Sequence, residues 1–285
     1  MQREAVHRRS GIVASLVSVT IPGLQRTTAL RCVLRCARET PLKMTKQRAD
    51  RLLVGRGLFE SRARAQAAIA AGRVNADGVP VRKASAEISA AAVIEAAPEH
   101  PYVSRGGVKL ASALDRFALD VKSRVCLDVG ASTGGFAEVL LARGARRVYA
   151  VDVGRDQLHA RLRSHKKIVS IEQTDIRALD PSRLSEPPDF ATVDVSFISL
   201  KLVLPAVEKL LQERAVLVAL IKPQFEAARR HVKKGIVRDP AVHAAICADI
   251  EAFLSARGWR VGGIIPSPIP GGDGNREFFV EAERG

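Results

Sequence analysis

The sequence predicts an α/β protein in which a doubly wound sheet of seven strands follows a small α+β module. From residue 104 onward, apolar runs of strand length alternate with amphipathic helical segments, as in a largely parallel sheet covered by helices. A glycine-rich turn, LDVGASTGG, follows the first of these runs, where open α/β sheets bind nucleotides. Before residue 98 the chain carries two arginine-bearing helical patterns and short strands instead.

Composition narrows the class of partner. The chain has 285 residues, of which 47% are hydrophobic, enough for one sizeable core and one smaller module. Its 45 Lys and Arg outnumber 30 Asp and Glu, which favours a polyanion such as RNA or DNA. Aromatic residues make up only 4%, which argues against a single-strand binder built on base stacking. The alternative interpretations of this positive charge are a surface that keeps the protein in solution and binding to an anionic membrane.

Cysteine and hydropathy patterns point away from metals and membranes. The cysteines at 32, 36, 126 and 247 form no C-x-x-C pair, and the histidines show no ligand spacing, so we expect no metal. A reducing, cytoplasmic compartment fits this usage. No stretch approaches the roughly 18 apolar residues that a membrane helix needs, so no integral membrane segment is expected.

Residues 1–43 form an arginine-rich segment that is broken by Pro22, Gly23 and Pro41. This composition predicts a basic, disordered arm. Met44 directly precedes the first well-patterned sequence, so translation that begins at Met44 is the alternative, and the sequence leaves both open.

Residues 44–97 predict a compact module. Its helical patterns are QRADRLLVGRG and SRARAQAAIAAG, followed by short strands around RVNADGVPV, KAS and AAVIEA. Ser61 stands at an N-cap position, and Gly57 and Gly72 stand where the helices stop. The Asp77-Gly78 pair supplies a tight turn between strands.

The module resembles the S-four-type RNA-binding domain of a ribosomal protein and of many RNA-modifying enzymes. The matching residues are Arg48, Asp50, Leu53, Ser61, Arg62, Ile69, Gly72, Val74 and the Asp77-Gly78 turn. The resemblance implies RNA binding, for which guanidinium groups suit phosphate oxygens. The candidate RNA-binding residues are Arg48, Arg51, Arg62, Arg64, Arg73, Arg82, Lys83 and Arg105. A helical hairpin whose arginines only keep it soluble is the alternative.

Residues 98–103 hold two prolines and no periodicity, which predicts a linker to a second domain at 104–285. That domain opens with a helix carrying Leu110, Leu114 and Phe117. Strands are expected at 125–129, 147–152, 168–172, 190–194, 215–221, 259–265 and 276–282. The first five are separated by helical or crossover segments and should be parallel. The last two are joined by PSPIPGGDGN, which suits a hairpin and an antiparallel last strand.

The glycine-rich turn predicts a cofactor site. Its spacing is not G-x-G-x-x-G, and a carboxylate at Asp128 favours a cationic ligand over the pyrophosphate of a rival class of cofactor. S-adenosylmethionine, which carries an ammonium and a sulfonium, suits that charge. Asp152, about twenty residues further on, can accept from both hydroxyls of a ribose. Asp175 can accept from an adenine amino group, or it can simply cap a helix.

The full set of candidate cofactor-binding residues surrounds this turn. They are Asp128, Gly130, Ala131, Ser132, Thr133, Gly134, Gly135, Phe136, Asp152, Val153 and Asp175.

Four charged residues form the candidate catalytic set. Asp194 and Lys222 end apolar strands, Glu277 is expected inside the last strand, and Lys109 belongs to YVSRGGVKL. Buried charges are rare unless they are paired, so we expect the four to converge at the carboxyl ends of the strands. They are similar to the lysine-aspartate-lysine-glutamate set of RNA ribose 2′-O-methyltransferases.

The motifs SRGGVKL, LDVGASTGGF, VDVG, DVSFISL, KPQFE and GNREF resemble those of the TlyA family, from about Met44 to the end of the chain. The resemblance implies a Rossmann-like methyltransferase sheet similar to that of the FtsJ group. It also implies S-adenosylmethionine-dependent methylation of ribose 2′-hydroxyls, with cytidines of ribosomal RNA or ribosomal subunits as targets. Some members were first described as haemolysins. A membrane-active cytolysin and a non-catalytic ribosome-assembly factor are therefore the alternatives.

The chemistry assigns a role to each member of the set. Lys222 is the predicted base, because a lysine beside Lys109 in a crevice has its ammonium form disfavoured by desolvation and like charge. Asp194 would orient Lys222, and Lys109 and Glu277 would position the target nucleotide.

The basic segment FEAARRHVKKGIVRDP follows Lys222 and is long for a connection. Two interpretations stay open: a lid whose Arg229, Arg230, Lys233 and Lys234 grip RNA phosphates, or a solvated run of charge.

Overall fold

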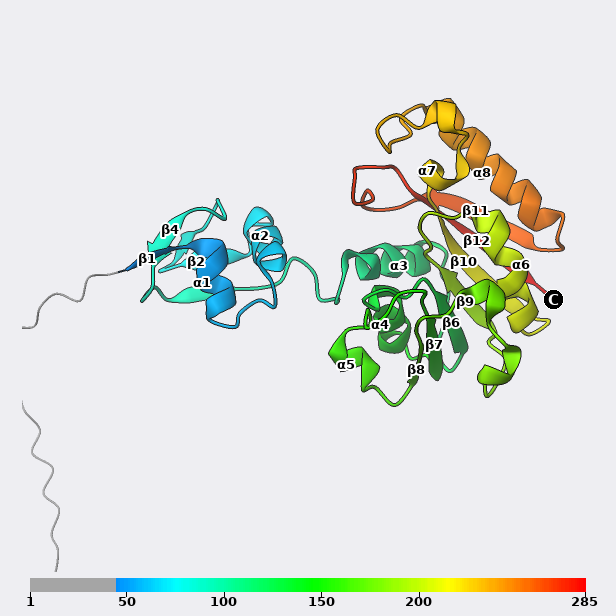
Figure 1. The fold of residues 1–285 in the computed structure, drawn as a ribbon, viewed down its shortest axis with the longest axis horizontal. Coiled ribbons are helices and arrows are strands. Elements are labelled where there is room, and N and C mark those ends of the chain that lie inside the picture. Colours follow the sequence, from blue (N-terminus) through cyan, green and yellow to red (C-terminus); the bar gives the residue numbers. More distant parts are fainter. Residues whose placement is uncertain (1–44) are drawn as a thin grey trace, which may run out of the picture.

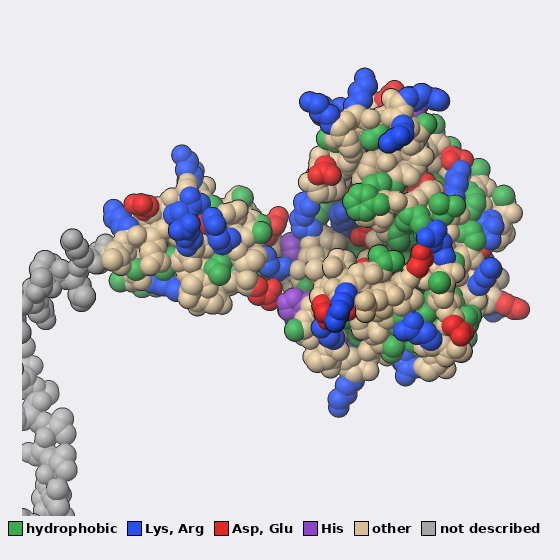
Figure 2. All heavy atoms as spheres, in the orientation of Figure 1, with side chains coloured by type: hydrophobic (Ala, Val, Ile, Leu, Met, Phe, Trp, Pro, Cys, Tyr) green, Lys and Arg blue, Asp and Glu red, His purple; other side chains and the backbone are tan. Residues whose placement is uncertain are grey.

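The computed structural model describes residues 45–285. The predicted basic arm at 1–43, Met44, Cys32 and Cys36 lie outside the described residues. A small N-terminal module is joined by an extended segment to a larger α/β domain (Figure 1). Lys and Arg side chains are spread over both parts (Figure 2).

The module is built from short elements. They are β1 (Lys46–Arg48), α1 (Ala49–Gly55), α2 (Arg62–Ala70), β2 (Val74–Ala76), β3 (Val79–Pro80), β4 (Glu87–Ser89) and β5 (Ile94–Ala96). β1 pairs with β4, and β2 pairs with β3 and β5, all antiparallel. Ser61 caps α2 by accepting from the backbone N–H of Arg64, and Asp77 and Gly78 both have positive φ in the predicted turn. The first helix starts at Ala49 rather than at residue 47, because residues 46–48 pair as a strand.

The larger domain contains the predicted seven-stranded sheet, which the structure confirms. Its strands are β6 (Val125–Val129), β7 (Arg147–Val151), β8 (Ile168–Ile171), β9 (Phe190–Val193), β10 (Ala215–Ile221), β11 (Arg260–Pro266) and β12 (Phe278–Arg284). The order across the sheet is β11-β12-β10-β9-β6-β7-β8. β12 runs antiparallel to β10 and β11, and the other neighbours are parallel.

Helices cover both faces of this sheet. They are α3 (Arg105–Arg116), α4 (Gly135–Ala142), α5 (Ala160–Arg163), α6 (Leu200–Leu210), α7 (Pro223–Glu226) and α8 (Pro240–Ser255). Short 3-10 turns occur at Ile176–Ala178, Pro181–Arg183 and Arg229–His231. Apolar residues of α3 and α4 pack on one face, and those of α6 and α8 pack on the other. β10 is buried along its whole length because it lies between β9 and β12.

The topology places a crevice between β6 and β9. The chain leaves β6 toward β7 on one side, whereas β9 pairs with β6 on the other, so the direction of winding reverses there. Such a reversal is where open α/β sheets bind ligands, at the carboxyl ends of the strands.

Within the described residues, no helix combines the length and the apolar character needed to cross a membrane. Residues 45–285 also bring together no group of three or more His, Cys, Asp or Glu that could hold a metal ion.

Candidate active site

The glycine-rich turn connects β6 to α4 with left-handed backbone at three residues. Gly130, Ser132 and Gly134 have φ of 82°, 46° and 95°. A Cβ on Gly130 would lie 2.3 Å from the backbone oxygen of Asp194. Only glycine allows both this φ and this approach, so the turn is pressed against the end of β9. The turn and Asp194 therefore form one wall of the crevice.

Asp152, just beyond β7, holds the turn in place. One carboxylate oxygen accepts from the backbone N–H of Ser132 and the other from that of Gly154, each at 2.7 Å. Each oxygen keeps a lone pair for a further donor, because a carboxylate has about four acceptor positions. Asp152 lines a cavity of about 610 Å³ together with Gly130, Ser132, Val153 and Asp175. A nucleoside with its ribose hydroxyls toward Asp152 fits this donor and acceptor pattern.

Asp175 caps the 3-10 turn at Ile176–Ala178 by accepting from the backbone N–H of Arg177. Its carboxylate also pairs with the Arg177 guanidinium at 2.6 Å, which lowers the pKa of Asp175. The structure thus shows the capping role that the sequence left open. Asp175 also lines the 610 Å³ cavity, so a contact with an adenine stays a prediction.

Asp128 lies within β6 and has no exposed surface. It accepts a hydrogen bond from the Thr192 hydroxyl at 2.9 Å. Burial raises the pKa of Asp128 to about 7. The residue is absent from the lining of both cavities at the turn, so its predicted influence on a cationic cofactor would act from beneath the surface.

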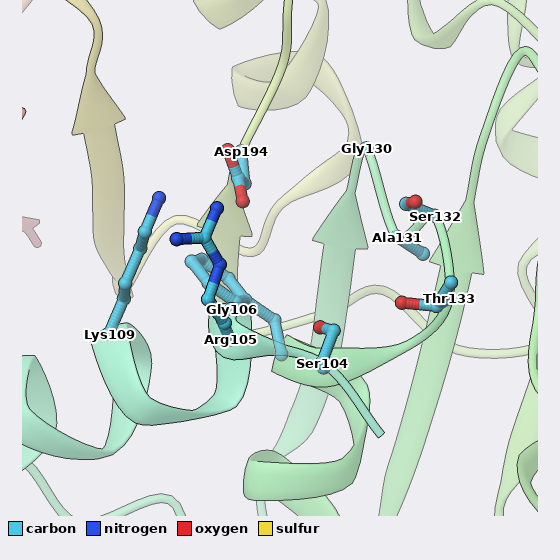
Figure 3. A pocket seen from close by; sticks show the side chains of 11 residues that line it. Ser104, Arg105, Gly106, Lys109, Gly130, Ala131, Ser132, Thr133 and Asp194 are labelled. Atoms are coloured by element: carbon cyan, nitrogen blue, oxygen red, sulfur yellow. The ribbon is translucent and has the colours of Figure 1, made fainter. Parts of the chain in front are cut away.

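A second cavity, of about 240 Å³, lies between the start of α3 and the glycine turn. Arg105 and Lys109, one turn apart on α3, rise toward the side on which Asp194 lies (Figure 3). Ser132 and Thr133 line the opposite wall. The remaining predicted turn residues, Ala131, Gly135 and Phe136, also line this cavity, and buried Gly134 is the N-cap residue that precedes α4.

The four candidate catalytic residues form two ion pairs. Lys109 Nζ lies 2.5 Å from Glu277 Oε2, and both side chains are at most 10% exposed. Lys222 Nζ lies 2.7 Å from Asp194 Oδ1 and donates to Ser196 Oγ at 2.9 Å. The sequence predicted that the positive charge of Lys109 would disfavour the ammonium form of Lys222. In the structure each of these two lysines instead has its own carboxylate partner.

Glu277 lies one residue before β12 rather than inside it. Its position depends on close packing, because a Cβ on Gly271 would lie 2.4 Å from Glu277 Oε1. The Pro- and Gly-rich loop that contains Gly271 therefore limits the space around the Glu277 carboxylate. The sequence pattern placed Glu277 inside a strand and did not predict this contact.

Three predicted RNA-binding residues have internal partners. Arg48 and Arg62 both donate to the carboxylate of Asp50, at distances from 2.8 to 3.2 Å, which holds the pKa of Asp50 well below its usual range. Arg64 donates to the carbonyl oxygens of Val103 at 2.6 Å and Tyr102 at 3.0 Å. Arg48 and Arg62 therefore form contacts inside the module, and Arg64 joins the module to the linker.

The other candidates in this group are exposed. Across residues 45–285, none of them has an ion pair or a side-chain hydrogen bond; they are Arg51, Arg73, Arg82, Lys83 and Arg105. They are free to contact an anion.

Sequence reasoning missed several residues of the site. Thr192 bonds Asp128, Ser196 bonds Lys222, and Glu138 accepts from the backbone N–H of Val103 at 2.6 Å. Thr192 carried a signal, because it is a polar residue inside an otherwise apolar strand.

Comparisons with known proteins fit this geometry. A family model described as FtsJ-like methyltransferase matches residues 102–284. The 16S/23S rRNA (cytidine-2′-O)-methyltransferase TlyA of Mycobacterium tuberculosis is 42% identical over 238 residues, which cover 82% of this chain and 89% of that protein. The chain belongs to the TlyA family of FtsJ-like methyltransferases. The resemblance seen in the sequence is confirmed.

Two further relatives support the TlyA assignment. The provisionally named rRNA methyltransferase YqxC of Bacillus subtilis is 46% identical over 239 residues, which cover 82% of this chain and 85% of that protein. A solved structure from Streptococcus thermophilus, provisionally named a hemolysin, is 43% identical with a TM-score of 0.67 and covers 85% of this chain and 89% of its own. S-adenosylmethionine is the cofactor of an FtsJ-like methyltransferase, and the cavity beside Asp152 fits it.

Proposed function

We propose that this chain methylates the ribose 2′-hydroxyl of a cytidine in ribosomal RNA, and that it does so in the cytoplasm. The observation that carries the proposal is the Lys222–Asp194 ion pair, 2.7 Å long, at the carboxyl ends of neighbouring strands. It lies against the glycine turn, because Gly130 contacts the backbone of Asp194. The named activity of the M. tuberculosis relative supports the same reaction.

S-adenosylmethionine supplies an electrophilic methyl group when it is bound. Asp152 and the turn at 130–136 would hold it, by accepting from hydroxyls and by close backbone approach. In this proposal the Lys222 amine accepts the proton of the attacking 2′-hydroxyl, and Asp194 then stabilises the resulting ammonium, as in the ion pair of the structure.

Lys109 and Glu277 have a positioning role in this proposal. Their ion pair is nearly buried, so the Lys109 ammonium is fixed in direction and keeps donors for the target nucleotide. Fixing the hydroxyl near the methyl carbon lowers the barrier by removing the entropy of encounter.

The division of labour is part of the proposal. Residues 44–97 act as an S-four-type RNA-binding domain, 98–103 as the linker and 104–285 as the methyltransferase domain. The exposed cations Arg51, Arg73, Arg82 and Lys83 support the first assignment, and the independent apolar core of the module supports its separate folding.

The test is transfer of labelled methyl to purified ribosomal subunits. Wild-type protein should produce label that survives alkaline hydrolysis, because a 2′-O-methyl group protects the adjacent phosphodiester. Lys222→Ala should abolish transfer and leave the cofactor dissociation constant unchanged by calorimetry. Lys209→Ala, at an exposed lysine of α6, is the matched control and should retain full activity.

Two outcomes separate the alternatives. If folded, cofactor-saturated protein labels neither ribosomal subunit, the proposal of an enzyme is wrong. Binding to the subunits without methyl transfer would then favour an assembly factor. Lysis of cells by purified protein without RNA would favour the cytolysin that the hemolysin name of the Streptococcus structure suggests.

A further inference from the structure

One cluster of cations has no role in the proposed chemistry. It lies far from the N-terminal module in the sequence. Residues 229–238, here the basic hairpin, carry Arg229, Arg230, Lys233, Lys234 and Arg238. All five are exposed, and within residues 45–285 none of them forms an ion pair. Lys and Arg side chains gather at this end of the molecule in Figure 2, above α7.

The hairpin has a defined backbone. Lys233 and Ile236 exchange two backbone hydrogen bonds of 2.9 and 3.0 Å. Lys234 and Gly235 between them have φ of 51° and 77°, as a two-residue turn of this kind requires. The two adjacent lysines are thus presented at the tip of a tight turn.

The hairpin is anchored to the loop that carries Glu277. Asn275 is 1% exposed; its side-chain N–H donates to the Gly235 carbonyl at 2.9 Å, and its side-chain oxygen accepts from the Val237 N–H at 3.1 Å. His243 of α8 contacts the Val237 carbonyl at 3.0 Å. Because Asn275 is two residues from Glu277, the lysine tip keeps a fixed place relative to the Lys109–Glu277 pair.

Arg276 joins the hairpin to the site. It is exposed and lines two cavities, one of about 420 Å³ shared with Arg238 and His243 and one of about 390 Å³ shared with Glu277 and the prolines of the preceding loop. The larger cavity is also lined by one acidic side chain, Asp273, and cations otherwise continue from the hairpin to the edge of the Glu277 carboxylate.

We infer that the basic hairpin and Arg276 form a second RNA-binding surface, which takes backbone phosphates of the RNA segment next to the target nucleotide. The inference rests on the proposed function. An anchored turn loses little conformational freedom on binding, so the hairpin acts as a fixed support and not as a lid.

An anionic membrane is the competing partner for such charge. Interfacial membrane binding also needs apolar side chains that enter the lipid. Among the described residues, the large apolar side chains that are exposed are Leu58, Val79, Val93, Val153, Val169, Phe197 and Leu202. None of them belongs to residues 229–238, so the surface offers phosphate contacts without an apolar anchor.

The test is the salt dependence of binding to purified ribosomal subunits by the full chain. Lys233→Gln/Lys234→Gln removes two phosphate contacts, so the slope of log affinity against log salt should flatten by about 1.5 and affinity should fall about 10-fold. The matched control, Lys122→Gln/Lys209→Gln, removes two exposed lysines near the amino ends of β6 and β10 and should keep the wild-type slope. The cofactor dissociation constant should stay unchanged in both.

Each other result overturns the inference. An unchanged slope for the hairpin variant would show that RNA does not touch this surface. Loss of binding to phosphatidylserine vesicles by the variant, with RNA binding intact, would assign the surface to membranes. Failure of the proposed function is distinguishable: wild-type protein would then show the hairpin-dependent slope without transferring methyl groups.

Discussion

The buried carboxyl of Asp128 makes protein stability depend on pH in a direction that can be worked out. The side chain lies inside β6, accepts from Thr192, and in the described part of the chain has no well-formed partner for Oδ2. Burial raises its pKa from 3.8 to about 7. The folded protein therefore binds this proton more tightly than the unfolded chain does.

The sign follows from this difference. The stability that protonated Asp128 contributes is fully present below about pH 4 and is lost as the pH rises through about 7. Between pH 5 and pH 7 the loss proceeds at about 1.4 kcal/mol per pH unit, and it levels off above that range, so about 3 kcal/mol is lost between pH 5 and pH 8.

Asp128→Asn removes this titration and keeps an oxygen for the Thr192 hydroxyl. We expect the free energy of unfolding of the variant, relative to wild type, to rise by about 3 kcal/mol between pH 5 and pH 8. Urea unfolding followed by the fluorescence of Trp259, the single tryptophan and a buried one, measures this difference. Asp273→Asn, at an exposed carboxyl, is the control and should show no such rise. Parallel pH profiles for wild type and Asp128→Asn would refute the reasoning.

Three further predictions follow from single contacts. Asp152→Ala removes the acceptor that holds the Ser132 N–H, so calorimetry should show cofactor affinity about 10- to 100-fold weaker, and unchanged affinity would remove Asp152 from the site. Gly130→Ala brings a Cβ to 2.3 Å from the Asp194 carbonyl oxygen at a φ of 82°, so thermal melting should occur at lower temperature and cofactor binding should be lost; a wild-type melting curve would contradict the close approach. The arginine partners of Asp50 lower its pKa, so its stabilising effect is present at neutral pH and is lost as the pH falls through the folded-state pKa. Asp50→Asn should therefore make the module more susceptible to limited proteolysis at pH 7. Equal cleavage rates for the variant and the wild type would argue against this role.

The sequence predicted those features that depend on local pattern. Seven apolar runs separated by helices and crossovers determine a sheet of this type, and a Pro- and Gly-rich hairpin determines the antiparallel last strand. Ser61 and the Asp77-Gly78 turn were predictable because capping and tight turns depend on a few adjacent residues.

Side-chain partnerships were not predictable in the same way. Lys109 pairs with Glu277 across 168 positions of sequence, and nothing in local periodicity indicates which carboxylate a lysine will meet. The same holds for Arg62, a predicted RNA-binding residue whose guanidinium also donates to Asp50, and for Arg64, which bonds the linker. Exposure alone does not distinguish Arg62 from Arg73, because both are exposed and Arg73 has no such partner among residues 45–285.

The two hydrogen bonds from Arg64 to the linker carbonyls shorten the free part of a linker, or tether, that is already short. Only residues 98–101 lie between the last residue of the predicted module and the two carbonyls that Arg64 holds. A tether of this kind keeps two binding surfaces at an effective concentration on the order of millimolar, and avidity can then exceed either single affinity by about 10²- to 10⁴-fold. The module and the methyltransferase domain, mixed as separate chains, will therefore capture an RNA far more weakly than the intact chain, although every individual contact is still available.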